Sequence, residues 1–202
     1  MTLTTFCGLP LQTAPGRVMR PRPASEQLVA LALTFLGARR ANGIEPARVV
    51  DVGTGSGALA IAIARAATEA ELWATDTSPE AIAGARENVA RHGLEDRIEV
   101  RLGDLLDPVP GAVDLVVANL PYLPAADAAL FADLAGEPPE AVFAPGDGLD
   151  PYRRLLAASA HRLRDGGAVA IQLHRRVLTA SAEGLGGLLQ EIERVLQPGL
   201  HA

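Results

Sequence analysis

Residues 119–122 read Asn119-Leu120-Pro121-Tyr122 and directly follow the apolar run 113–118. The Asn119 amide offers an acceptor oxygen and a donor NH2 group. Pro121 fixes its own φ and so directs the preceding carbonyl, while Tyr122 supplies a flat face for stacking. Asn119, Pro121 and Tyr122 are therefore candidate catalytic residues of an enzyme that methylates an amide or exocyclic amino nitrogen. Taken alone, the same residues also fit a strand followed by a proline turn.

A glycine-rich turn, residues 51–57, joins an expected strand to an expected helix. Glycines let the backbone approach a ligand where a Cβ would clash. The third glycine comes one residue too early for the dinucleotide pattern, and an acid at position 51 would repel a pyrophosphate. That acid would instead suit the amino group of a methionine moiety, which favours S-adenosylmethionine (SAM). The candidate cofactor-binding residues of this turn are Asp51, Gly53, Thr54, Gly55 and Gly57.

Two further acids follow the next two expected strands. Asp76 could accept both ribose hydroxyls, because Ser78 and Pro79 already form a good helix start without it. Asp104 could present a carboxylate to the adenine amino group, or could be a solvated turn acid. Asn119 completes the predicted cofactor-binding set, since it lies at the same edge of the expected sheet.

Composition limits the possible function classes. The 202 residues carry a net charge of −6, which disfavours a nucleic-acid partner because phosphate contacts need clustered positive charge. We expect no metal site, since the four histidines lack metal-ligand spacing. We also expect no signal peptide, no membrane span and a cytoplasmic location, with Cys7 as the single cysteine.

The order of elements predicts an α/β fold, a Rossmann-like sheet of parallel strands flanked by helices. Residues 1–23 are expected to be an irregular lead over the active site, and residues 24–202 a single domain. All candidate residues then fall beyond the carboxyl ends of strands, where ligands bind such sheets. The expected strands are 48–52, 71–75, 97–102, 113–118 and 168–173, in the order 3-2-1-4-5, and the expected helices are 25–41, 57–68, 78–92 and 151–164.

From residue 6 to residue 173 the chain resembles the release-factor glutamine methyltransferases of the HemK/PrmC type. The resemblance implies SAM bound by Gly53, Gly55, Asp76 and Asp104. It implies a glutamine side-chain amide of a peptide chain release factor, gripped by Asn119 and the backbone near Leu120 and Pro121. The matching segments are Phe6 to Leu9, Pro15-Gly16, Pro21 to Val29, 51–57, Asp76 to Pro79, Gly103-Asp104, 119–122, Glu137-Pro138 and 146–153.

The chain departs from this family at three places. We expect the helical domain that usually comes first in this family to be lacking, and Leu120 stands where the family usually has proline. After residue 173 the two closing strands are expected to be reduced or absent, which would leave an exposed edge and allow a homodimer. Methylation of adenine in nucleic acid or of a small amine, or SAM binding without catalysis, remain the alternative functions.

Overall fold

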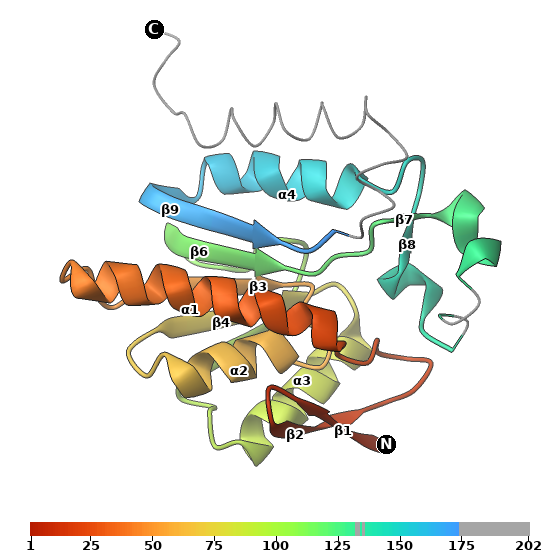
Figure 1. Ribbon diagram of the computed structural model, residues 1–202, viewed down its shortest axis with the longest axis horizontal. Helices are drawn as coiled ribbons and strands as arrows, with labels where there is room; N and C mark the ends of the chain where they lie inside the picture. The colour runs from red at the N-terminus through yellow and green to blue at the C-terminus, as the bar shows by residue number, and fades with distance from the viewer. Residues whose placement is uncertain (132–133, 135, 174–202) are drawn as a thin grey trace, which may run out of the picture.

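The computed structural model describes residues 1–131, 134 and 136–173, and its centre is a five-stranded parallel sheet (Figure 1). The strands lie in the order β5-β4-β3-β6-β9, which is the predicted order 3-2-1-4-5. The predicted α/β class is therefore confirmed. The strands are β3 (Arg48–Val52), β4 (Glu71–Asp76), β5 (Ile98–Leu102), β6 (Val113–Ala118) and β9 (Leu163–Ile171).

Helices cover both faces of the sheet because successive strand residues point to opposite faces. Val49 of β3 packs into the cluster formed with α1 (Glu26–Ala41), α2 (Ala58–Ala66) and α3 (Pro79–Arg91). Val50 packs into the cluster on the other face, formed with α4 (Asp150–Ala160). The buried strands are consequently apolar on both sides, as parallel strands are expected to be.

The expectation of an irregular lead is wrong for residues 2–13, which form an antiparallel hairpin of β1 (Thr2–Phe6) and β2 (Leu9–Thr13). The turn consists of Cys7 and Gly8, both with positive φ, which is the conformation that two-residue hairpins require. Phe6 and Leu11 are buried in the core beside α1 and α2. The division of the chain into a lead and one domain stays a prediction.

The end of one expected helix is wrong. The helix expected over 151–164 ends at Ala160, and β9 already begins at Leu163, so Gly166 and Gly167 lie inside this strand, where the pairing with β6 shifts register. On α1, Leu28 and Val29 are buried, whereas Leu31 is 57% exposed. The expectation of reduced closing strands concerns residues 174–202, which lie outside the described residues.

The long segment 119–150 contains short elements of its own. The two-residue strands β7 (Leu123–Pro124) and β8 (Phe143–Ala144) pair in parallel. The 3-10 helices η2 (Ala125–Leu130) and η4 (Pro139–Ala141) belong to the described part of the segment between these strands, and η1 (Pro23–Ser25) leads into α1. The short pair holds residues 119–124 close to residues 143–144 beside the sheet.

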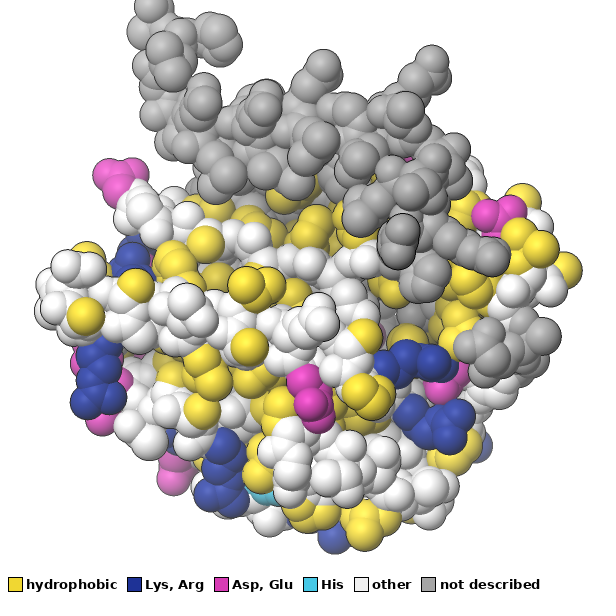
Figure 2. All heavy atoms as spheres, viewed as in Figure 1, with side chains coloured by type: hydrophobic (Ala, Val, Ile, Leu, Met, Phe, Trp, Pro, Cys, Tyr) yellow, Lys and Arg dark blue, Asp and Glu magenta, His cyan; other side chains and the backbone are white. Residues whose placement is uncertain are grey.

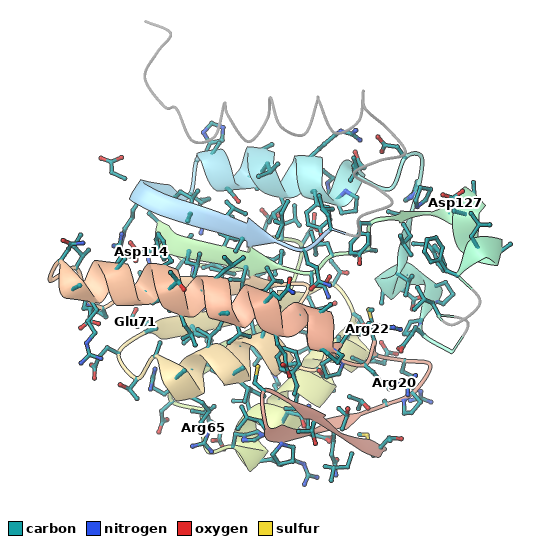
Figure 3. All side chains as sticks on the ribbon, viewed as in Figure 1. Arg20, Arg22, Arg65, Glu71, Asp114 and Asp127 are labelled. Atoms are coloured by element: carbon teal, nitrogen blue, oxygen red, sulfur yellow. The ribbon has the colours of Figure 1, made fainter. Side chains whose placement is uncertain are left out.

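Asp114 holds the opposite, amino-terminal edge of the sheet together, at the left of Figure 3. Its fully buried carboxylate accepts hydrogen bonds from Arg39 Nη2 at 2.6 Å, Arg48 N–H at 2.7 Å and Arg164 Nη1 at 3.0 Å. These donors come from α1, β3 and β9. A buried carboxylate with several charged and backbone donors is tolerated only while all of them stay paired.

We expect Asp114→Ala to lower the free energy of unfolding by about 3–5 kcal/mol, because it leaves buried donors of Arg39 and Arg48 without an acceptor. Urea denaturation at pH 7 measures the loss. Glu71→Ala is the control, since Glu71 is an exposed partner of the same Arg48 and its loss should cost less than about 1 kcal/mol. Equal effects of the two substitutions would contradict the role given to Asp114.

Candidate functional site

A cavity of about 310 Å³ opens at the carboxyl-terminal edge of the sheet. Its walls come from the segments that follow β3, β4, β5 and β6, joined by residues 17–19 of the lead and by η4. The predicted site residues on its wall are Gly53, Gly55, Asp76, Asp104, Asn119 and Pro121. The other four, Asp51, Thr54, Gly57 and Tyr122, do not line it.

The glycine-rich loop is fixed to the end of β4 by backbone hydrogen bonds. The N–H groups of Gly53 and Thr54 both donate to the Thr75 carbonyl at 2.9 Å. The Gly55 N–H donates to Asp76 Oδ2, also at 2.9 Å. The loop is thus held in place without a ligand, which lowers the entropy cost of binding one.

Asp76 connects this loop to α3. Its Oδ1 accepts the Ser78 N–H at 2.9 Å, and the Ser78 hydroxyl in turn caps α3 by accepting the Ala81 N–H at 3.2 Å. The predicted cap at Ser78 is confirmed. A carboxylate offers about four lone-pair sites, so Asp76 retains acceptor capacity toward the cavity that it lines.

Asp51 lies beneath the loop, fully buried. Its Oδ2 accepts the Thr54 hydroxyl at 2.7 Å and the Ala60 N–H at 3.2 Å, while its buried Oδ1 has no partner. Burial disfavours the charged form and raises the pKa of Asp51 from 3.8 to about 6. The unpartnered oxygen marks a position where a cationic donor would be stabilised.

The three glycines of the loop serve different purposes, and all have positive φ. A Cβ on Gly53 would lie 2.6 Å from Leu120 Cδ2, and one on Gly57 would lie 3.4 Å from Ala85 of α3, so these positions are restricted by packing. A Cβ on Gly55 would meet only Val18, at 3.8 Å, and would project beside the cavity. Gly55 is therefore the glycine whose missing side chain leaves room for a ligand.

Asp104 lines the cavity and forms an ion pair with Arg154 of α4. Both side chains are about half exposed, so the pair contributes little to stability. The arrangement places a charged pair on the cavity wall, next in sequence to Gly103 and Leu105, which also line it.

The Asn119 amide is held by the start of α1. Its Nδ2 donates to the Ser25 hydroxyl at 3.2 Å, and Ser25 itself is buried. Asn119 also lines a second, smaller cavity of about 60 Å³ with Gly53, Gly55 and Ser25. Sequence reasoning gave Ser25 no role of its own, because nothing in the local pattern indicated that residue 25 would lie against residue 119.

Glu137 fastens the lead segment across the mouth of the site. Its buried carboxylate accepts the Arg20 N–H at 3.1 Å, Arg20 Nε at 3.3 Å and Arg22 Nη2 at 3.4 Å. Figure 3 labels the two arginines at the right of the molecule, where dark-blue side chains gather in Figure 2. Among the described residues, Glu137 is the acid that pairs with both arginines, so its carboxylate fixes the lead segment to the loop before η4.

Tyr122 is placed behind the cavity wall. Its ring packs among apolar side chains, 6.4 Å from the ring of Tyr152 and tilted by 30°. Burial is the main cause of the raised pKa of Tyr122. Pro121, by contrast, lines the cavity directly, so the stacking surface available in this structure is offered by proline rather than by tyrosine.

The residues present fit SAM. The volume lies within the range of small-molecule sites. Gly55 leaves open space beside the loop, and Asp76 retains free acceptor positions toward the cavity that it lines. Asp51 does not line the cavity, so its carboxylate beneath the loop would act on an amino group through its charge and not by direct contact. Within the part of the chain that the structure describes, no group of three or more His, Cys, Asp or Glu could hold a metal ion, and no helix is long and apolar enough to cross a membrane.

Comparison with known proteins agrees with this geometry. A family model described as the methyltransferase small domain matches residues 33–134. A solved structure of ribosomal protein L11 methylase from Lactobacillus delbrueckii subsp. bulgaricus is similar, with a TM-score of 0.56 and 25% identity, and the match covers 85% of this chain and 71% of that one.

Curated relatives include two proteins named release factor glutamine methyltransferase. The one from Deinococcus radiodurans is 44% identical over 173 residues, which cover 85% of this chain and 60% of the relative. The one from Gloeobacter violaceus is 42% identical over 168 residues, covering 82% and 57%. The chain therefore spans somewhat more than half the length of these relatives.

The raised pKa of Asp51 predicts a particular dependence of stability on pH. A pKa of 3.8 unfolded and about 6 folded means that the contribution of Asp51 is fully present below pH 4 and is lost as the pH rises through 6. In the native chain this lowers the free energy of unfolding by about 3 kcal/mol between pH 4 and pH 8. We expect Asp51→Asn, which cannot titrate, to lack this decrease.

Urea denaturation of both proteins from pH 4 to pH 8 measures the difference. The control is Asp107→Asn, which changes an exposed acid outside the glycine-rich loop. Asp76→Asn would not serve, because Asp76 bonds to the loop. Parallel pH profiles of the native chain and Asp51→Asn would refute the assignment.

Proposed function

The chain belongs to the methyltransferase small domain family, and on this premise we propose that it transfers a methyl group from SAM to the side-chain amide nitrogen of a glutamine in a protein. The observation that carries the proposal is the position of Asn119. Its amide, oriented by Ser25, lies on the cavity wall between the glycine-rich loop and Pro121. The two curated relatives support a peptide chain release factor as the protein substrate.

The cofactor would be held along the sheet edge. Asp76 would accept the ribose hydroxyls, Asp104 would lie near the adenine, and Gly55 would face the methionine portion. The Asp51 carboxylate beneath the loop would favour a positively charged amino group nearby, since its Oδ1 is unpartnered. When bound, SAM supplies an electrophilic methyl group.

Asn119 and the Leu120 carbonyl would orient the acceptor. An amide nitrogen is a poor nucleophile because its lone pair is delocalised into the carbonyl. Asn119 Oδ1 and the Leu120 oxygen would accept its two N–H groups and turn the nitrogen toward the cofactor. Such positioning supplies about 7–11 kcal/mol in the most favourable cases.

The reaction needs no dedicated base, because the proton can leave after the methyl group has been transferred. Residues 17–19 and η4 border the cavity and would limit the access of water to the reacting groups. A charge of −6 gives the chain little attraction for nucleic acid, which favours a protein acceptor over an RNA base.

The proposal is tested with labelled SAM against three acceptors: a release factor, ribosomal RNA and a set of small amines. Methylation of a glutamine in the release factor, located by mass spectrometry, is the expected result. If only RNA or only the amines are methylated, the chain is a methyltransferase with a different acceptor from the one proposed. If none of the three acceptors is methylated, the proposed activity is wrong, and SAM binding alone remains.

For the cofactor, we expect Gly55→Val to abolish SAM binding measured by calorimetry. The new side chain would project beside the cavity, and the positive φ of 54° adds backbone strain. Gly43→Val is a matched control, since Gly43 has a φ of 70° and open space but lies after α1 at the opposite edge of the sheet. SAM affinity that is equal in the two variants would refute the cofactor position.

For the acceptor, we expect Asn119→Ala to reduce methyl transfer by about 100-fold or more while SAM affinity changes little, since the side chain orients the acceptor. Asn119→Asp should also be severe for a glutamine acceptor, because it removes the NH2 group that donates to Ser25 and adds a charge. Steady-state kinetics and calorimetry measure both effects, with Asn42→Ala, at the end of α1, as the control. Full activity of Asn119→Ala would show that residues 119–122 form only a turn and have no part in catalysis.

A further inference from the structure

The hydroxyl of Tyr152 is buried behind the residues that would grip the acceptor. Tyr152 belongs to α4, is fully buried and is the largest of the side chains with less than 2% exposure. Its hydroxyl lies 2.6 Å from the Gln172 carbonyl, 3.1 Å from the Leu120 nitrogen and 3.3 Å from the Leu120 carbonyl. Three backbone groups therefore converge on one phenol oxygen.

The distances settle how this hydroxyl is used. A phenol has one proton, and the shortest contact assigns it to the Gln172 carbonyl. The Leu120 N–H then donates to the phenol oxygen. The Leu120 carbonyl is left with lone pairs for another donor, which is the role given to it in the proposed reaction.

The Leu120 N–H belongs to the peptide unit that joins Asn119 to Leu120. Fixing this N–H fixes the plane of that peptide, and with it the direction in which the backbone leaves Asn119. Ser25 holds the Asn119 side chain from the other side. The two contacts together restrain the Asn119 amide and the Leu120 peptide.

Gly148, just before α4, packs against the segment that follows β6. Gly148 has a φ of 84°, and a Cβ there would lie 2.3 Å from the Tyr122 carbonyl oxygen. Gly148 thus packs directly against the backbone of Tyr122, while Tyr152 reaches Leu120 with its side-chain hydroxyl. Burial leaves no water to replace the Tyr152 hydroxyl if it is removed.

We propose that Tyr152 is a positioning residue for methyl transfer, whose hydroxyl holds the Leu120 peptide in the orientation that presents the acceptor nitrogen. This inference rests on the proposed function. The hydroxyl touches neither cofactor nor acceptor and acts through the backbone of residues 119–121. The hydroxyl also links the segments that follow β6 and β9, since Leu120 and Gln172 lie just beyond the ends of these strands, so a readout other than stability is needed.

Tyr152→Phe tests the inference, since it removes one oxygen and keeps the ring. We expect kcat to fall by about 10-fold, while the Kd for SAM stays within about twofold. Ser159→Ala is the matched control: it removes another buried hydroxyl of α4, which donates to the Leu155 carbonyl within the same helix. Ser159→Ala should lower the melting temperature but leave kcat unchanged.

A measurement independent of activity separates this inference from the proposed function. Amide hydrogen exchange followed by NMR should show the Leu120 N–H protected in the native chain and exchanging faster in Tyr152→Phe, but not in Ser159→Ala. If the native chain methylates no glutamine, the proposed function fails although the Leu120 bond can still be measured. Unchanged kcat in Tyr152→Phe, or unchanged exchange of Leu120, would overturn the positioning role.

Discussion

The carboxylate of Asp76 is the interaction on which the site depends. It joins the loop after β3 to the start of α3 by accepting one N–H from each, at 2.9 Å. Without such a link, a loop of three positive-φ glycines would sample many conformations, and a ligand would have to order it. The same acid that is expected to recognise the cofactor therefore also builds the surface on which the cofactor would lie.

The two edges of the sheet are organised differently. At the amino-terminal edge, the oxygens of the Asp114 carboxylate are fully engaged by α1, β3 and β9. Buried atoms without a partner occur mostly at the other edge: Asp51 Oδ1, Arg22 Nε and Gln172 Oε1 belong to segments that border the site. Buried polar atoms without a partner lower stability, so proteins retain them mainly at sites that bind ligands. Their concentration at the carboxyl-terminal edge of the sheet is therefore typical of a functional site.

Sequence reasoning predicted what is local and failed where contacts are long-range. The strand order and the cap at Ser78 follow from hydrophobic runs and from residue types at fixed offsets. The hairpin of residues 2–13 was missed because its short strands contain a proline and its turn places a non-glycine residue, Cys7, at positive φ. No local pattern indicates that Ser25 would meet Asn119, since 94 residues separate them.

Among the candidate site residues, too, the sequence indicates what depends on local position and not what depends on packing. Gly53, Gly55, Asp76 and Asn119 could be named from spacing, because each follows a strand end and the topology brings those ends together. Sequence spacing does not distinguish a residue on the cavity wall from one beside or beneath it, which is why Asp51 and Tyr122 could be named as candidates although neither lines the cavity. The direction of a side chain at a strand end depends on the packing of the layer below.

The contact of Glu137 with Arg20 and Arg22 has a consequence for how the chain matures on the ribosome. The partners are 117 and 115 residues apart, so both arginines are synthesised long before their acceptor. Until Glu137 emerges, the lead can fold its hairpin but cannot be fixed across the mouth of the site. Strands β3 to β6 are synthesised before Glu137, whereas Pro151 and Arg154 of the cavity wall follow it. The cavity can therefore be completed only after this contact becomes possible, and a nascent chain is expected to acquire cofactor affinity late in its synthesis.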